Sequence, residues 1–297
     1  CGTKATKEQD AYRQYGITCM ESGKYEDAVK AFQNALGESI GHIGEKELDI
    51  CFYKAKAQAL DGKTKDALAT YDAIIKYNKD ARAYYLRGDL YMDMGEEKKG
   101  KADFESAVQH GKKNYEIYIG IYESLSRHEK KDEGQKYLSA AMEIKGDKPE
   151  DELYKGRISY LLGENKDAIS YLEKAKEHKQ MLASYYLGLA YDANGDSDKA
   201  KKCIAEYIKS GVATSYDLYE LGMQEMQDGN YKNALTYFNS GLELEKVPNK
   251  QNLMKSAIAA YEYSGDFDSA KKMMKEYLKA YPDDEEAKHE NTFLETR

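Results

Sequence analysis

Tryptophan is absent from this chain of 297 residues, and there are only three prolines and four cysteines. The composition is therefore typical of an ordinary soluble helical protein rather than a disordered or β-rich one, and the few cysteines exclude a disulfide-dense extracellular scaffold. No apolar run approaches the roughly 20 residues that a membrane-spanning helix requires. Net positive charge is lacking too: the formal charge is −8 and the pI is near 5.4. This acidic balance argues against nucleic acid as the partner.

Motifs for catalysis or metal binding are also lacking. There is no GxSxG motif, no phosphate-binding loop and no GxGxxG after a strand. The five histidines are scattered, with no HExxH motif and no i, i+4 pair. Cys19, Cys51 and Cys203 lie in helical patterns and are interpreted as small buried residues. We expect no metal and no cofactor, and we predict a protein that is not an enzyme.

An internal repeat is the main feature that is present. Three segments show it most clearly: YGITCMESGKYEDAVKAFQNAL (15–36), LGLAYDANGDSDKAKKCIAEYI (187–208) and LGMQEMQDGNYKNALTYFNSGL (221–242). Eight units align when they start near residues 9, 48, 81, 115, 149, 181, 215 and 251. The spacing and the apolar periodicity predict two helices in each unit.

Four columns of the alignment carry the repeat. The eighth position is small in six units, where two helices are expected to approach closely: Gly16, Ala55, Gly88, Gly156, Gly188 and Gly222. The fifteenth is glycine in seven units, where a left-handed residue can end the first helix: Gly23, Gly62, Gly95, Gly163, Gly195, Gly229 and Gly265. The twentieth position is small throughout: Ala28, Ala67, Gly100, Gly134, Ala168, Ala200, Ala234 and Ala270. The twenty-fourth is a large apolar side chain, interpreted as a plug between neighbouring units: Phe32, Tyr71, Phe104, Leu138, Leu172, Ile204, Phe238 and Met274.

The fourth unit departs from this pattern. Tyr122 stands at the eighth position and Glu129 at the fifteenth. Gly120 would allow an alternative alignment two residues earlier in that unit.

These columns resemble the tetratricopeptide repeat (TPR), a helix-turn-helix unit of 34 residues. The resemblance implies an all-α fold, an α-solenoid in which about eight units form a right-handed superhelix. It places an array at residues 9–282 with no domain boundary inside it. Residues 1–8 are expected to be an extended tether, and residues 283–297 a capping helix in which Phe293 and Leu294 pack back onto the array.

In the resembled family, the first helix of each unit lines a concave groove through positions 2, 5, 9, 12 and 13. Carried over, these positions are mostly charged in the first four units, for example Asp49, Arg82 and Arg127. Later units present an apolar strip that we interpret as a binding site for a peptide or a partner protein: Tyr160, Tyr185, Leu189, Tyr216, Tyr219, Met223 and Met226. The alternative is that these side chains simply pack against the following unit. No asparagine occupies position 9, so the clamp with which some family members bind a C-terminal carboxylate is not expected.

Cys1 precedes Gly2 and a polar stretch, which resembles the start of a mature bacterial lipoprotein. The resemblance implies a lipid on the Cys1 sulfur, and hence a protein anchored to the cell membrane on its extracytoplasmic face. The function we expect is a non-catalytic scaffold for protein–protein interaction. Two alternatives stay open: an intracellular adaptor that begins with cysteine by accident, and a structural subunit of a cell-envelope assembly or secretion complex.

Overall fold

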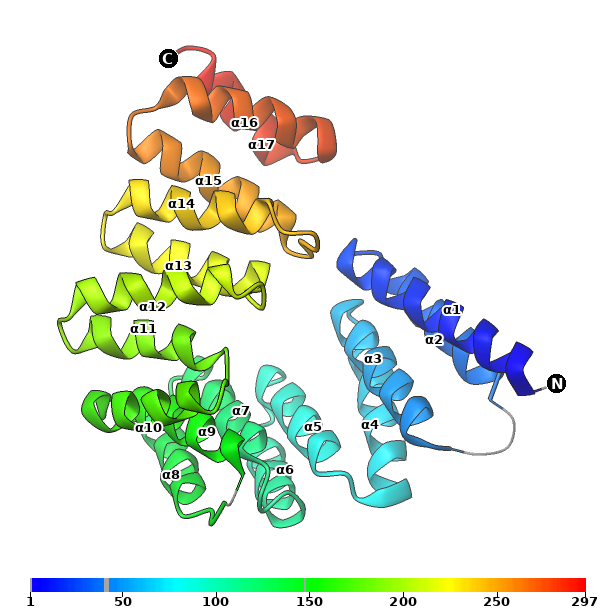
Figure 1. Ribbon diagram of the computed structural model, residues 1–297. Coiled ribbons are helices and arrows are strands. Elements are labelled where there is room, and N and C mark those ends of the chain that lie inside the picture. The colour runs from blue at the N-terminus through cyan, green and yellow to red at the C-terminus, as the bar shows by residue number, and fades with distance from the viewer. Residues whose placement is uncertain (1, 40–42, 147) are drawn as a thin grey trace. The chain divides into compact units, whose positions relative to one another are not determined.

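The computed structural model describes residues 2–39, 43–146 and 148–297, and these residues form seventeen helices and no strand (Figure 1). Cys1, the expected lipid attachment site, lies outside the described residues. No described helix is both long enough and apolar enough to cross a bilayer.

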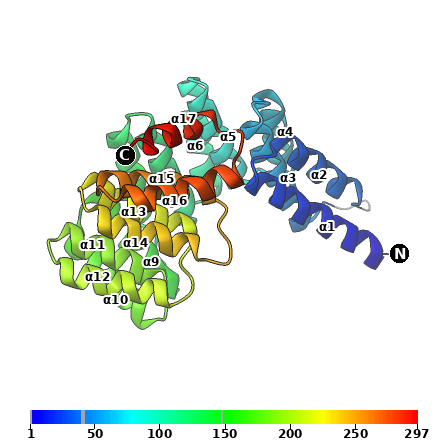
Figure 2. The same cartoon turned by 90° about the horizontal axis from the view of Figure 1, so that it is seen from above.

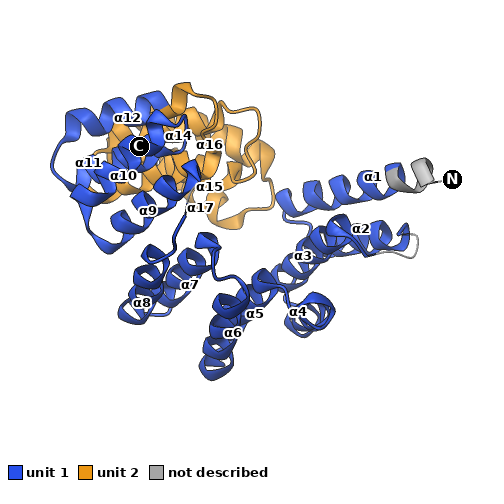
Figure 3. Cartoon of the chain, turned by 60° about the horizontal axis from the view of Figure 1, so that its bottom comes forward, with its two compact units in different colours: residues 1–206 blue, residues 207–297 orange. Residues whose placement is uncertain are grey.

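The chain divides into two compact units, residues 1–206 and residues 207–297 (Figure 3). The first unit contains α1 (Gly2–Glu21), α2 (Tyr25–Gly37), α3 (Glu45–Leu60), α4 (Thr64–Asn78), α5 (Ala81–Asp93), α6 (Glu97–His110), α7 (Tyr115–Arg127), α8 (Lys131–Met142), α9 (Pro149–Leu162), α10 (Asn165–Glu177), α11 (Ala183–Ala193) and most of α12 (Ser197–Lys209). The second contains α13 (Ser215–Gln227), α14 (Tyr231–Leu242), α15 (Lys250–Tyr263), α16 (Phe267–Ala280) and α17 (Glu285–Leu294). We expected an array without a boundary, and the alignment of repeats does not anticipate this division, which falls inside α12.

Within each unit, every helix packs against the next one along the chain. Helices α1 and α2 lie side by side in two views, and so do α15 and α16 (Figures 1 and 2). The first helices of successive pairs also meet, as α5 meets α7 and α13 meets α15. This stacking of helix pairs confirms the predicted α-solenoid.

The eighth and twenty-fourth positions are where the two helices of a pair come closest. A Cβ atom added to Gly222 would lie 2.2 Å from Cε1 of Phe238, sixteen residues later in the same pair. The same contact recurs between Gly16 and Phe32 at 2.6 Å, Gly88 and Phe104 at 2.9 Å, Gly156 and Leu172 at 2.4 Å, and Gly188 and Ile204 at 2.4 Å. Each plug therefore fills the space over the glycine of its own pair, in addition to its contacts with the next pair.

The turn inside each pair ends the first helix as predicted. All seven glycines of the fifteenth position have a positive φ, between 70° and 85°. The next residue donates its backbone N–H to a carbonyl five residues back, as Lys24 does to Cys19 at 2.8 Å. This bond satisfies a carbonyl that the end of the helix would otherwise leave unpaired.

The fourth pair keeps the same alignment although its eighth position is large, because the ring there packs against the small twentieth position. Tyr122 fills the eighth position, and a Cβ atom added to Gly134 would lie 3.0 Å from its ring. Gly120 instead lies under Tyr85 of the preceding pair, so the alternative alignment is not adopted. Glu129 has a φ of 60°, which shows that a residue with a side chain occupies the left-handed turn here.

The start of the chain differs from the expected tether. Helix α1 begins at Gly2, so the backbone of residues 2–8 is helical rather than extended. Alanine, lysine, glutamate and glutamine favour helix, and a helix that is already packed extends at little further cost. Gln9 is buried in α1, and its side-chain amide donates to Ser39 and Glu47.

Helix α17 lies inside the segment expected to cap the array. Asp284 is its N-cap and accepts from the backbone N–H of Ala287 at 3.0 Å. Leu294 is fully buried in the cluster formed with α15 and α16, whereas Phe293, expected to pack beside it, is 43% exposed.

Candidate binding surfaces

The charged side chains of the first helices in residues 1–206 largely pair with one another. Their partners lie one repeat apart, so the bonds run from pair to pair along the stack. The ion pairs are Asp10–Lys46 (2.6 Å), Arg13–Asp49 (2.6 Å), Asp89–Arg127 (2.6 Å), Glu123–Arg157 (2.9 Å) and Glu116–Arg157 (3.4 Å). Charges that are already paired in this way offer little to a charged ligand.

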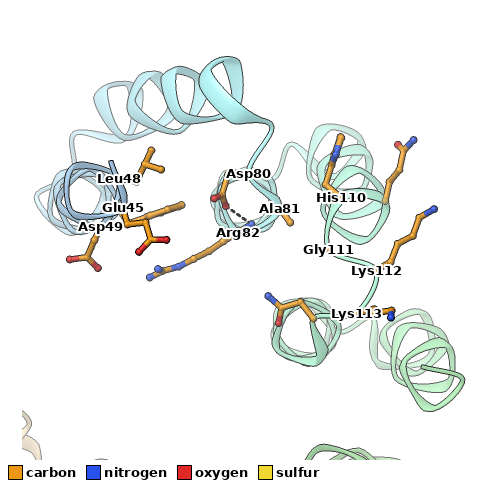
Figure 4. Close-up of a pocket in the computed structure, with 13 residues that line it drawn as sticks. Glu45, Leu48, Asp49, Asp80, Ala81, Arg82, His110, Gly111, Lys112 and Lys113 are labelled. Atoms are coloured by element: carbon orange, nitrogen blue, oxygen red, sulfur yellow. Dashed lines mark hydrogen bonds between the residues drawn. The ribbon is translucent and has the colours of Figure 1, made fainter. Parts of the chain in front are cut away.

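An open pocket of about 960 Å³ interrupts this ladder of ion pairs. It lies between α3, the first turn of α5 and the connection from α6 to α7 (Figure 4). Leu48, Phe52 and Ala81 supply its apolar lining. The pocket belongs entirely to residues 1–206.

Helix caps set the positions of its polar side chains. The Asp80 carboxylate accepts from the backbone N–H groups of Arg82 (2.8 Å) and Ala83 (3.1 Å), which fixes the first turn of α5. Arg82 therefore extends from that turn toward α3, with its guanidinium carbon 4.4 Å from the Phe52 ring centroid (Figure 4). Asn114 caps α7 in the same way, immediately after Lys113.

Three cations of the pocket have no carboxylate partner within the described residues: Arg82, Lys112 and Lys113. Of the three acidic side chains that line the pocket, Asp49 pairs with Arg13 and Asp80 caps α5, whereas Glu45 forms no ion pair within the described residues. Three cations therefore face one carboxylate that is not already engaged. The pocket therefore combines an apolar lining with unpaired positive charge. Such a surface can bind a carboxylate carried on a peptide or on a protein surface.

The predicted apolar strip falls in both compact units. In residues 1–206, Tyr160 is half-buried against the cluster that contains Leu172, and burial raises its pKa. Tyr185 is half-buried, with its ring edge-on to Tyr186 at 5.1 Å between centroids. Leu189 is also half-buried.

The four remaining residues of the strip lie on α13. Tyr219, Met223 and Met226 pack against the cluster that includes Leu253 of α15, so the structure brings these three together. This packing agrees with the alternative interpretation, and the binding interpretation of these three residues stays a prediction. Tyr216 differs, because it is 56% exposed.

Sequence reasoning named Arg82 but missed the lysines of the pocket. Lys112 and Lys113 lie between repeats, outside the helix positions carried over from the family. The signal was present as GKKN (111–114), two adjacent lysines directly before a capping asparagine. Within the described residues, no three His, Cys, Asp or Glu side chains are grouped so that they could bind a metal ion.

Helix pairs stacked in this way, five of them with a large side chain packed over a glycine, define a repeat protein of the α-solenoid class. Family models described as tetratricopeptide repeat match residues 16–75, 81–109, 182–210 and 251–284, just over half of the chain. The chain belongs to the tetratricopeptide repeat family. Tetratricopeptide repeats generally mediate protein–protein interactions.

Solved structures are similar in fold. A tetratricopeptide repeat protein from Parabacteroides merdae ATCC 43184 is 12% identical with a TM-score of 0.50, covering 86% of this chain and 99% of that one. PilW, a type IV pilus biogenesis factor, is 16% identical with a TM-score of 0.45, covering 83% and 99%. A chain of the APC/C Cut9–Hcn1 hetero-tetramer is 15% identical with a TM-score of 0.46, covering 91% and 52%. At 12% identity, the likeness to the Parabacteroides merdae protein shows the fold alone. No curated protein matches the chain significantly.

Proposed function

We propose that the chain is a non-catalytic scaffold for protein–protein interaction, and that its pocket between α3, α5 and α7 binds an acidic segment of a partner. The observation that carries this proposal is the contrast between the ladder of paired charges and three cations that have no carboxylate partner in the described part of the chain: Arg82, Lys112 and Lys113. Leu48 and Phe52 offer apolar contact to the same segment, which adds affinity that charge alone does not supply.

A fluorescein-labelled acidic peptide, Ser-Glu-Ser-Asp-Glu-Ser, tests the proposal by fluorescence anisotropy. We expect measurable binding at low salt, and a loss of about tenfold in affinity when Lys112 and Lys113 are both changed to alanine. The matched control changes Lys201 and Lys202 on α12, two exposed lysines outside the pocket. Equal weakening by both double variants, or equal binding of the peptide with Gln and Asn in place of Glu and Asp, would contradict the proposal.

The apolar strip stays a prediction, and Tyr216 is the residue that tests it. The ring centroids of Tyr219 and Phe238 lie 6.2 Å apart, and Tyr219 packs against the core. Replacing Tyr219 would therefore disturb the fold as well as any binding. Tyr216→Ala removes an exposed ring without opening a cavity. If the strip binds a partner, this variant captures less of that partner from a membrane extract than the wild type does, at unchanged thermal stability.

Anchoring at the cell membrane through a lipid on Cys1 also stays a prediction. Metabolic labelling of the product of the complete gene with radioactive palmitate tests it directly. Label that the wild type incorporates and Cys1→Ser does not would support the anchor. Absence of label from both would contradict it.

A further inference from the structure

A second cavity, of about 300 Å³, lies in residues 207–297, between side chains of α15, α16 and α17. Its inner surface is apolar: Ile258 and Met274 are buried, and Ala259 and Ala287 lie beside them. Tyr263 stands at its rim and is 67% exposed, with one ring face stacked on Tyr231. The cavity is distinct from the pocket between α3, α5 and α7.

The positive charge of this cavity is already neutralised. Lys255 contacts Asp284 at 2.9 Å and Glu286 at 3.4 Å, and its ammonium lies 5.8 Å from the ring centroid of Tyr277. The ammonium group of Lys255 thus already occupies one position beside a carboxylate and a tyrosine ring in this part of the fold. Because Lys255 is already paired with Asp284 and Glu286, it does not neutralise the acidic side chains on the other side of the cavity.

Two of those acids have no cation. Glu262 and Glu290 line the cavity and form no ion pair within the described residues. Oε1 of Glu262 is buried and accepts no hydrogen bond. Burial and the facing carboxylate of Glu290 raise the pKa of Glu262. A cation placed between the two carboxylates would favour their charged forms and so oppose the rise in the pKa of Glu262.

We propose that this cavity binds a lysine or arginine side chain of a partner protein. The aliphatic stem of such a side chain fits along Ile258 and Met274, and its charged end reaches Glu262 and Glu290. No grouping of acidic side chains in the described residues suits a metal ion, so the cavity favours an organic cation with an apolar stem. That the cation comes from a protein rests on the proposed function, whereas the preference for a cation does not.

Simple probes test the preference without an identified partner. The methyl resonances of Met274, Ala259 and Ala287 are followed by NMR in the full chain during titration with n-butylammonium and n-butylguanidinium. We expect saturable shifts at millimolar concentration for both cations, and none at the same concentrations for 1-pentanol or pentanoate. The double variant Glu262→Gln, Glu290→Gln should weaken binding by about tenfold, because it removes both charges with little change of shape.

Glu295→Gln is the matched control, since it removes a charge at the end of α17 outside the cavity. It should leave the cation titrations unchanged. Equal shifts with 1-pentanol would show an apolar cavity without charge preference and overturn the proposal. Unchanged cation binding in the double variant would overturn it as well. Neither result bears on the acidic-peptide experiment, which reports on a different pocket, so the two proposals can fail separately.

Discussion

At the scale of the residue, the fold depends on contacts that only a hydrogen atom leaves room for. Five pairs repeat the contact between a glycine of the eighth position and a plug sixteen residues later. Phe238 is fully buried, so its ring has no free space into which it could move when Gly222 gains a side chain. The neighbouring helices must then separate, or the ring must leave its preferred rotamer.

Gly222→Ala is therefore expected to destabilise the protein by about 1–3 kcal/mol, the range for overpacking a tight core. Gly37→Ala is the control, since an added Cβ atom there meets nothing within 4 Å and the φ is not positive. Urea denaturation followed by circular dichroism measures both. A urea midpoint for Gly222→Ala as high as that for Gly37→Ala would show that the core accommodates an added Cβ atom beside Phe238 without loss of stability.

Glu129 offers the opposite test, because it carries a side chain where seven other pairs have glycine. A left-handed conformation costs a residue with a Cβ atom about 1–2 kcal/mol, and the greater freedom of glycine in the unfolded chain returns part of that difference. We expect Glu129→Gly to stabilise the protein by about 0.5–1 kcal/mol. Urea denaturation measures the change, and a destabilised variant would contradict this account of the turn.

At the scale of the element, one carboxylate fixes the start of α17. The Asp284 side chain accepts from the Tyr277 hydroxyl at 2.5 Å, from Lys255 at 2.9 Å and from the Ala287 N–H at 3.0 Å. These bonds, the first above all, lower the pKa of Asp284 well below its usual value. The ionised form therefore holds α16, α15 and α17 together.

This lowered pKa predicts acid sensitivity. The stabilisation is complete above the unfolded pKa of about 3.9 and is lost as the pH falls from there toward the folded value. Between pH 6 and pH 3 the thermal midpoint should fall less for Asp284→Asn than for the wild type, since the variant has already lost the charge. Asp283→Asn is the control, because the Asp283 side chain makes no hydrogen bond or ion pair with any residue that the structure describes. Equal falls in all three proteins would show that Asp284 contributes nothing to the acid response.

At the scale of the whole molecule, each helix pair contacts chiefly its neighbours within the same compact unit. The stability of such a protein is close to a sum of local terms, so damage at one site spreads little. In Gly222→Ala, amide hydrogen exchange should quicken in α13 and α14 while α5 and α6 keep the protection of the wild type. Faster exchange through all helices would indicate a single cooperative unit and contradict this expectation.

The repeat made most of this fold predictable, and the reason is that its determinants are local. Gly222, Gly229 and Phe238 act within one pair, at fixed spacings that a single sequence displays. The candidate pocket was predictable only in part. Arg82 occupies an expected groove position, but Lys112 belongs to it through the course of a loop, which no spacing encodes.

Pairing of charges was not predictable either. A count of acidic and basic groove positions cannot reveal that Arg13 pairs with Asp49 while Arg82 has no carboxylate partner among the described residues. The role of the apolar strip on α13 could not be predicted from the sequence for a related reason. Met223 sits at the border between groove and core, and only the packing of α15 decides how much of it remains accessible.

The contact between glycine and plug has one more consequence, because both partners belong to the same pair. Five pairs carry both the glycine and the plug that packs over it, and in the fourth pair Tyr122 packs over Gly134 of the same pair. A whole repeat can therefore be duplicated or deleted in a gene without leaving a mismatched half of that contact behind. As far as this contact is concerned, repeats can be added or removed as whole units, so the number of repeats can change in evolution or by design.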